Sequence, residues 1–178
     1  MTRPIATLLT ALLISASLAN ADEGFSAGAS VGRVNIETNN SSVIFDEDDT
    51  GWKVFGAYML NKYFGIEGGY VDFGTPDSNI LGPNLVIDAD GLDLFGVGAF
   101  PLSESFSVFG KIGLLSWDAE IKLDGVTVDV DDGTDVVFGI GGDLSVSDRF
   151  AIRGEIEWFD IDDSGAVWMF SLGGMFRF

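Results

Sequence analysis

Charged side chains recur in the middle of segments that are otherwise apolar or rich in glycine. Each lies on the polar face of a segment in which apolar and small or polar residues alternate: Glu67, Lys111, Asp143, Arg153 and Glu155. Charges that leave water must be paired, because the desolvation of an unpaired ion costs several kcal/mol. We therefore predict that these five residues meet as an ion-pair cluster. Such a cluster is either a gate in a narrow ion path or a fixed polar plug, and the plug is the simpler interpretation.

Acidic residues are concentrated in four long connecting stretches, which hold eighteen Asp and Glu against one base, Lys122. Ca²⁺ and Mg²⁺ prefer oxygen ligands, so two acidic runs are weak candidates for divalent-cation sites. Their residues are Asp46, Asp48, Asp129, Asp131 and Asp132. Neither run has the spacing of an EF-hand loop. A solvated, repulsive surface without a ligand is the simpler interpretation.

The composition excludes several classes of function. There is no histidine and no cysteine, so histidine-dependent hydrolases and histidine metal sites cannot be built. The formal net charge of −19 argues against a nucleic-acid partner, because phosphates are bound by Lys and Arg. No nucleophile stands beside a base. We therefore predict neither an enzyme nor a cofactor.

The amino-terminus has the pattern of a secretory signal peptide. Arg3 precedes an apolar run from Ile5 to Leu18, and the small residues of Ala19-Asn20-Ala21 follow. The run is shorter than the ~20 residues that span a bilayer as a helix. We predict that residues 1–21 are cleaved and that residues 22–178 form one exported domain.

Eight later segments alternate with a period of two, which predicts β-strands. They cover residues 25–36, 52–60, 64–71, 91–100, 106–114, 136–146, 150–158 and 167–178. Short connections at 61–63, 102–105 and 147–149 alternate with long ones at 37–51, 74–91, 118–135 and 160–166. This asymmetry is typical of outer-membrane barrels, with periplasmic turns and extracellular loops. The predicted fold is all-β: an eight-stranded antiparallel up-and-down transmembrane β-barrel in the bacterial outer membrane.

The two faces of the predicted strands indicate which side meets lipid. Bulky aliphatic residues share one face, whereas the polar face is rich in Gly, Ala and Ser. A soluble lipocalin-type barrel would reverse this arrangement, so we expect the small polar face to line the lumen. Aromatic residues at the strand ends are predicted to anchor the barrel at the membrane interfaces. They are Tyr58, Tyr70, Phe100, Phe106, Trp158, Trp168 and Phe178.

Four stretches carry a family resemblance: VFGAYMLNKYFGIEGGYVDFG, FGKIGLLSW, FAIRGEIEW and the terminal SLGGMFRF. They resemble the OmpA transmembrane-domain family, whose loops differ from these. The resemblance implies an outer-membrane barrel inserted by the barrel assembly machinery, which reads a terminal aromatic strand. The corresponding insertion signal is Phe170, Leu172, Phe176 and Phe178. It also implies a luminal gate of ion pairs, although Val97 stands here in place of a base. We expect no periplasmic peptidoglycan-binding domain.

Two classes of function remain open from the sequence. The protein is an integral outer-membrane barrel with a structural or surface-interaction role, presenting acidic loops, or it is a narrow channel for ions or small solutes. The expected partners are outer-membrane lipid, lipopolysaccharide and the barrel assembly machinery. Divalent cations are further candidate ligands of the loops.

Overall fold

The computed structural model describes residues 24–37, 49–74, 77–78, 85–123, 126–161 and 165–178. The predicted signal peptide lies outside the described residues, as do Asp46 and Asp48. No helix among the described residues is long and apolar enough to cross a membrane.

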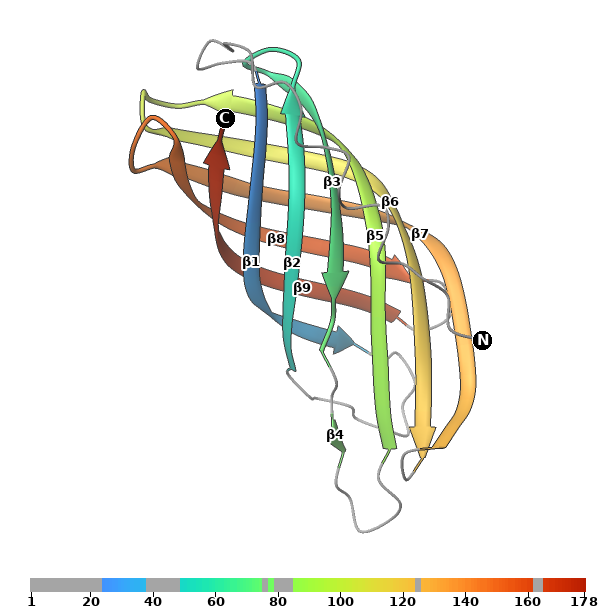
Figure 1. The fold of residues 1–178 in the computed structure, drawn as a ribbon. Coiled ribbons are helices and arrows are strands. Elements are labelled where there is room, and N and C mark those ends of the chain that lie inside the picture. Colours follow the sequence, from blue (N-terminus) through green and yellow to red (C-terminus); the bar gives the residue numbers. More distant parts are fainter. Residues whose placement is uncertain (1–23, 38–48, 75–76, 79–84, 124–125, 162–164) are drawn as a thin grey trace.

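Eight long antiparallel strands form a closed ring (Figure 1), which confirms the predicted fold class. The strands are β1 (Gly24–Glu37), β2 (Asp49–Met59), β3 (Phe64–Asp72), β5 (Leu85–Pro101), β6 (Phe106–Leu123), β7 (Val126–Ser145), β8 (Phe150–Ile161) and β9 (Gly165–Arg177). A two-residue strand, β4 (Asp77–Ser78), pairs with β5 outside this ring.

The ring closes because the first and last long strands pair with each other. β1 and β9 are antiparallel from Ser26–Arg177 to Glu37–Ala166. Alternating residues with β-branched and aromatic side chains favour extended backbone, and a sheet in lipid must leave no open edge, since unpaired backbone groups there cost several kcal/mol each. The terminal strand is therefore the structural partner that closes the sheet.

The three short connections are shaped by polar side chains that cap their own backbone. In the β2–β3 turn, Oδ1 of Asn61 accepts hydrogen bonds from the backbone N–H groups of Tyr63 (2.9 Å) and Phe64 (3.0 Å). Ser103 and Ser147 accept from Phe106 and Phe150 at 3.0 and 3.1 Å. Asn and Ser favour turns for this reason, so all three hairpins are explained locally.

Strand pairing extends into all four predicted long loops: β2 begins at Asp49, β5 begins at Leu85, and two of the loops are mostly strand, so their predicted bounds are wrong. Most of 118–135 is strand: β6 reaches Leu123, β7 starts at Val126, and the two remain in register apart from a bulge at Ile121/Lys122. β8 and β9 likewise extend into 160–166 and pair up to Ile161–Gly165. Charged and polar residues interrupt the alternation of apolar residues by which strands are recognised in the sequence. These segments nevertheless pair with a neighbouring strand.

The interior is also less uniform than predicted. Bulky aliphatic residues do lie on the outer face, among them Leu92, Leu94 and Ile140, each more than 60% exposed. The inner face, however, contains large apolar side chains besides Gly, Ala and Ser. These include Phe55, Phe95, Phe109, Phe159 and Met169, all buried. Eight strands leave an interior that side chains must fill, so small residues alone would leave voids.

Glycine is required where an inner side chain would meet the neighbouring strand. A Cβ at Gly113 of β6 would collide with the carbonyl oxygen of Leu94 and lie 2.7 Å from the Phe95 ring. At Gly110 of the same strand, a Cβ would meet only the Gly139 carbonyl oxygen, at 3.9 Å.

We predict that Gly113→Ala lowers the free energy of unfolding by about 1–3 kcal/mol, as overpacking does in other cores. Urea unfolding of the barrel in lipid vesicles measures the change. Gly110→Ala is the matched control and should behave like the parent chain. Equal stabilities for the two variants would contradict the described β5–β6 packing.

Candidate functional site

The most unusual feature of the barrel is a set of buried charges in its interior. Six strands contribute them, because inward-facing positions at similar depth in neighbouring strands meet across the narrow lumen. The residues are Lys53 of β2, Glu67 of β3, Asp93 of β5, Lys111 of β6, Asp143 of β7, and Arg153, Glu155 and Glu157 of β8, all at most 8% exposed. The structure thus brings together the five charges identified from the sequence, and it adds three more. We call these eight residues the interior network.

Lys111 is the centre of the interior network. Its Nζ lies 2.9 Å from Glu67 Oε1, 2.6 Å from Glu155 Oε1 and 2.9 Å from Glu157 Oε1. An ammonium group has three donors, so three carboxylates from two strands satisfy it. Lys111 therefore ties β3 to β8 across the lumen.

Arg153 holds the part of the network nearest the short turns. Its Nε and Nη2 donate to the two carboxylate oxygens of Asp143, at 2.8 and 3.0 Å, and its Nη1 donates to Glu67 Oε2. The planar guanidinium suits such a two-pronged contact. From the sequence we expected Arg153 to compensate both Asp143 and Glu155. The structure pairs Arg153 with Asp143, whereas Glu155 pairs with Lys111.

Lys53 organises the network toward the loop end. Its Nζ lies 2.7 Å from Asp93 Oδ2 and 2.7 Å from Glu157 Oε1. Because Glu157 Oε1 also contacts Lys111, the ion pairs form one connected chain along the barrel axis. It runs from Asp143 through Arg153, Glu67, Lys111, Glu157 and Lys53 to Asp93.

Aromatic rings pack against all three cations. The Phe95 ring centroid lies 4.8 Å from Lys53 Nζ and 4.1 Å from Lys111 Nζ. The Arg153 guanidinium lies 4.8 Å from the Phe55 ring and 4.3 Å from the Phe109 ring. Such cation–π contacts add to the ion pairs when both groups are desolvated. They also fill the interior around the charges.

The interior network carries more acid than base. Among the described residues it contains five carboxyls and three cations. Asp93 Oδ1 and Glu157 Oε2 are buried and accept no hydrogen bond from the described residues. Any ion that entered this interior would meet a negative potential, which favours cations over anions.

Sequence reasoning missed Lys53, Asp93 and Glu157 as members of the network. All three share the inward parity of their strands with residues that we did place inside, such as Glu155 beside Glu157. The alternation of inward and outward residues along each strand could therefore have identified all three. Val97 stands where the family resemblance implies a base. In the structure it is buried in a cluster of apolar side chains rather than in an ion pair.

Aromatic side chains form two bands on the outer surface. At the loop end, Trp158 and Trp168 stack with ring centroids 5.4 Å apart, and Trp52 packs on Tyr70 at 5.5 Å. At the turn end, Phe178 contacts Phe25 and Phe176 at 5.4 and 5.3 Å. The other predicted anchors are also exposed, namely Tyr58, Phe100 and Phe106. Their anchoring role remains a prediction.

The predicted insertion signal lies on the outer face of β9. Phe170, Leu172, Phe176 and Phe178 are 49%, 63%, 42% and 52% exposed. These side chains are accessible to another protein or to lipid.

The candidate cation ligands lie apart from the interior network. Asp129, Asp131 and Asp132 are exposed on the loop-end part of β7. Within the described residues, no group of three or more acidic side chains is arranged to hold a metal ion.

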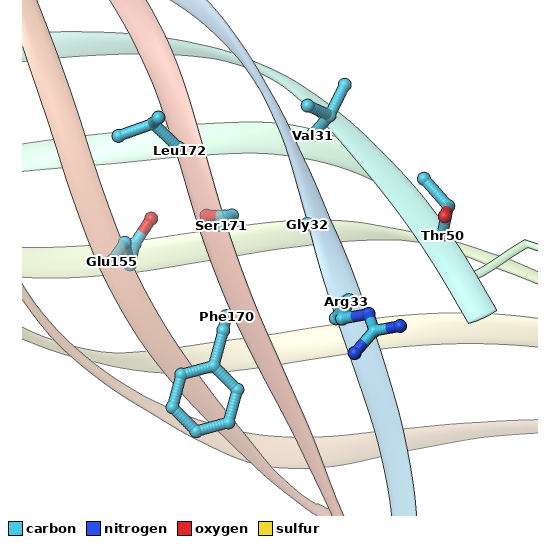
Figure 2. Close-up of a pocket in the computed structure, with 8 residues that line it drawn as sticks. All are labelled: Val31, Gly32, Arg33, Thr50, Glu155, Phe170, Ser171 and Leu172. Atoms are coloured by element: carbon cyan, nitrogen blue, oxygen red, sulfur yellow. The ribbon is translucent and has the colours of Figure 1, made fainter. Parts of the chain in front are cut away.

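A shallow groove of about 480 Å³ lies on the barrel wall where β1, β9 and β8 run side by side. Figure 2 shows Gly32 of β1, Ser171 of β9 and Glu155 of β8 in a row across three neighbouring strands. Val31, Leu172 and Phe170 give the groove an apolar outer rim, and Arg33 and Thr50 lie at its loop end. Small side chains at Gly32 and Ser171 therefore bring the outer surface close to the interior network.

A family comparison accounts for this architecture. The model of the outer membrane protein beta-barrel domain matches residues 5–178. The chain belongs to this family. The family places the barrel in the bacterial outer membrane, as predicted.

Known relatives confirm the resemblance to OmpA. Outer membrane protein A of Escherichia coli O157:H7 is 26% identical over 98% of this chain and 53% of its own length. The Klebsiella pneumoniae protein is 29% identical over 74% of this chain and 42% of its own length. The chain spans about half the length of the curated relatives it matches.

Solved structures of small barrels share the fold. Ail of Yersinia pestis, crystallised with the heparin analogue sucrose octasulfate, superposes with a TM-score of 0.64 at 16% identity, covering 88% of this chain and 99% of Ail. The N-terminal barrel of Pseudomonas aeruginosa OprF gives a TM-score of 0.60 at 12% identity, over 88% of this chain and 99% of that one. At such identities the likeness shows the fold alone.

We predict that Arg153→Met lowers the free energy of unfolding by about 3–5 kcal/mol, because it leaves Asp143 buried without its partner. Urea unfolding in vesicles measures the loss. Arg153→Met combined with Asp143→Leu should recover most of it, since both charges are then gone. Arg177→Met is the control: Arg177 is partly buried and donates to Ser145 Oγ, so its loss should cost about 1 kcal/mol. A single variant no weaker than this control would contradict the assigned pairing.

Proposed function

We propose that the protein is a sealed outer-membrane barrel with a structural or surface-interaction role rather than a channel or an enzyme. The observation that carries this proposal is the connected interior network with its packed rings. Ion pairs cross the lumen from β3 to β8 around Lys111, and Phe95 fills the space beside it. A path for ions would require several of these contacts to open together, which is costly in a desolvated interior.

The part of the barrel beyond the loop-end aromatic band supports an interaction role. The three longest strands, β5, β6 and β7, extend beyond their neighbours there (Figure 1). The charged side chains that the described residues expose on this extension are all acidic: Asp118, Glu120, Asp129, Asp131 and Asp132. We propose that this surface selects basic partners and repels polyanions. It should therefore not share the affinity of Ail for a heparin analogue.

We likewise propose the other partners that were expected from the sequence. Outer-membrane lipid would cover the apolar outer face, and lipopolysaccharide phosphates would meet Arg33, an exposed base beside the groove of Figure 2. Divalent cations would bridge the acidic residues to those phosphates. The exposed face of β9 would serve the barrel assembly machinery during insertion.

The alternative, a narrow channel, is favoured by one observation. The interior network has an excess of carboxyls, and Asp93 Oδ1 and Glu157 Oε2 are unpaired within the described part of the chain. A barrel that conducted through this interior would prefer cations.

We predict that the refolded parent chain shows no openings above baseline in planar bilayers. A triple variant, Lys111→Ser, Glu155→Ser and Phe95→Ala, removes one paired acid, one base and the ring beside them, and it should produce openings. Heat-modifiable migration on a gel verifies that both proteins are folded. Frequent cation-selective openings of the parent chain would overturn the sealed-barrel proposal in favour of the channel.

A further inference from the structure

Beyond the loop-end aromatic band, the sheet has one edge that pairs with no strand among the described residues. β7 pairs with β8 only from Val136–Asp160 to Ser145–Ala151. From Val126 to Asp135 every residue except Val128, which lies in the bulge, pairs with β6 on one side, and no described strand pairs with this segment on the other. Figure 1 shows this part of β7 as the outermost strand, beyond the ends of β8 and β9. The barrel is therefore closed at membrane depth and open above it.

The free edge lies outside the membrane. The outer aromatic band at the loop end includes Phe138, Trp158 and Trp168, which pack on one another. Aromatic bands mark the headgroup level, and Asp135 is already three residues beyond Phe138. At about 3.3 Å per residue, the ten-residue edge is roughly 33 Å long.

The residues of this edge favour pairing with an additional β-strand. Its β-branched residues favour extended backbone, and Val126, Val128 and Val130 are 66%, 52% and 61% exposed. It contains neither lysine nor proline, two residues that often protect an exposed edge, and its one irregularity is the bulge at Val128. A row of backbone donors and acceptors thus stands beside apolar side chains that neither membrane nor protein covers within the described residues.

Charge decides which partner can pair with this edge. Asp129, Asp131 and Asp132 lie on it, and Asp118 and Glu120 follow on β6 behind it. A second copy would place its own aspartates against these, which is unfavourable in a strand pair. An extended segment with lysine or arginine at alternate positions would gain both backbone hydrogen bonds and charge pairing.

We propose that the free edge of β7, from Val126 to Asp135, is a docking site for an extended basic segment of another protein, which adds to the sheet as a further strand. β-Strand addition of this kind gains affinity from the main chain and specificity from alternate side chains. The proposal deepens the proposed surface-interaction role and rests on it.

The probe is a nine-residue peptide of alternating lysine and valine, tested on the full chain refolded in detergent micelles. Its control has the same side chains but methyl groups on alternate backbone nitrogens, which block strand pairing on one side and keep the charge. We expect methylation to weaken binding by at least tenfold, the equivalent of about 1.4 kcal/mol, in a fluorescence anisotropy titration. Replacing Asp129, Asp131 and Asp132 together by Asn should also weaken binding and reduce its salt dependence.

Disulfide trapping locates the peptide, because the chain contains no cysteine of its own. Asp132→Cys and Asp118→Cys form a matched pair: the two residues face each other, one on the edge strand and one on β6. A strand added to β7 would approach the first within disulfide range and lie one strand further from the second. Peptides with cysteine at successive positions should cross-link to Asp132→Cys in alternation, and hardly at all to Asp118→Cys.

Three other results would overturn the docking proposal. Equal binding of the methylated and unmethylated peptides would mean attraction by charge alone. Equal cross-linking of the two cysteine variants would place the peptide elsewhere, and preferential Asp132→Cys dimers would assign the edge to a second copy. If the bilayer recordings show a sealed barrel and the peptide fails these tests, only the docking site is wrong. If the parent chain conducts, the proposed function fails whatever the peptide does.

Discussion

The rest of the structure depends on one constraint: backbone N–H and C=O groups cannot remain unpaired in lipid. Pairing of β1 with β9 meets that constraint and turns the sheet into a ring. Closure of the ring then determines which inward side chains come into contact. Eight strands leave no room for a wide pore, so inward side chains from opposite strands must touch. The interior network is a consequence of this narrowness, because charges brought together without water must find one another.

The interior network is built from shared partners rather than isolated pairs. Glu67 joins Arg153 to Lys111, and Glu157 joins Lys111 to Lys53. Losing one member therefore leaves two others under-compensated, which is why buried networks of this kind are costly to disturb. The same feature supports a sealed barrel, since no single side-chain movement separates all of the contacts around Lys111.

Above the membrane the constraint is relaxed, because water can satisfy an open backbone edge. β6 and β7 continue past the point at which β8 ends, and among the described strands the segment from Val126 to Asp135 has a neighbour on one side only. Acidic residues limit pairing between copies there, while leaving the edge open to a basic partner. A single chain thus has a sheet that is closed in lipid and open in water.

The sequence by itself determined the membrane-spanning strands, the side of each that meets lipid and five of the buried charges, because a period of two is a local property that needs no knowledge of neighbours. It did not reveal that 118–135 is strand, since the charged residues there break the apolar alternation and their pairing comes from β6. It also did not assign partners. Arg153 binds Glu67 and Asp143 rather than Glu155, and only the tertiary structure decided this, because strand register and ring closure set which inward residues share a depth.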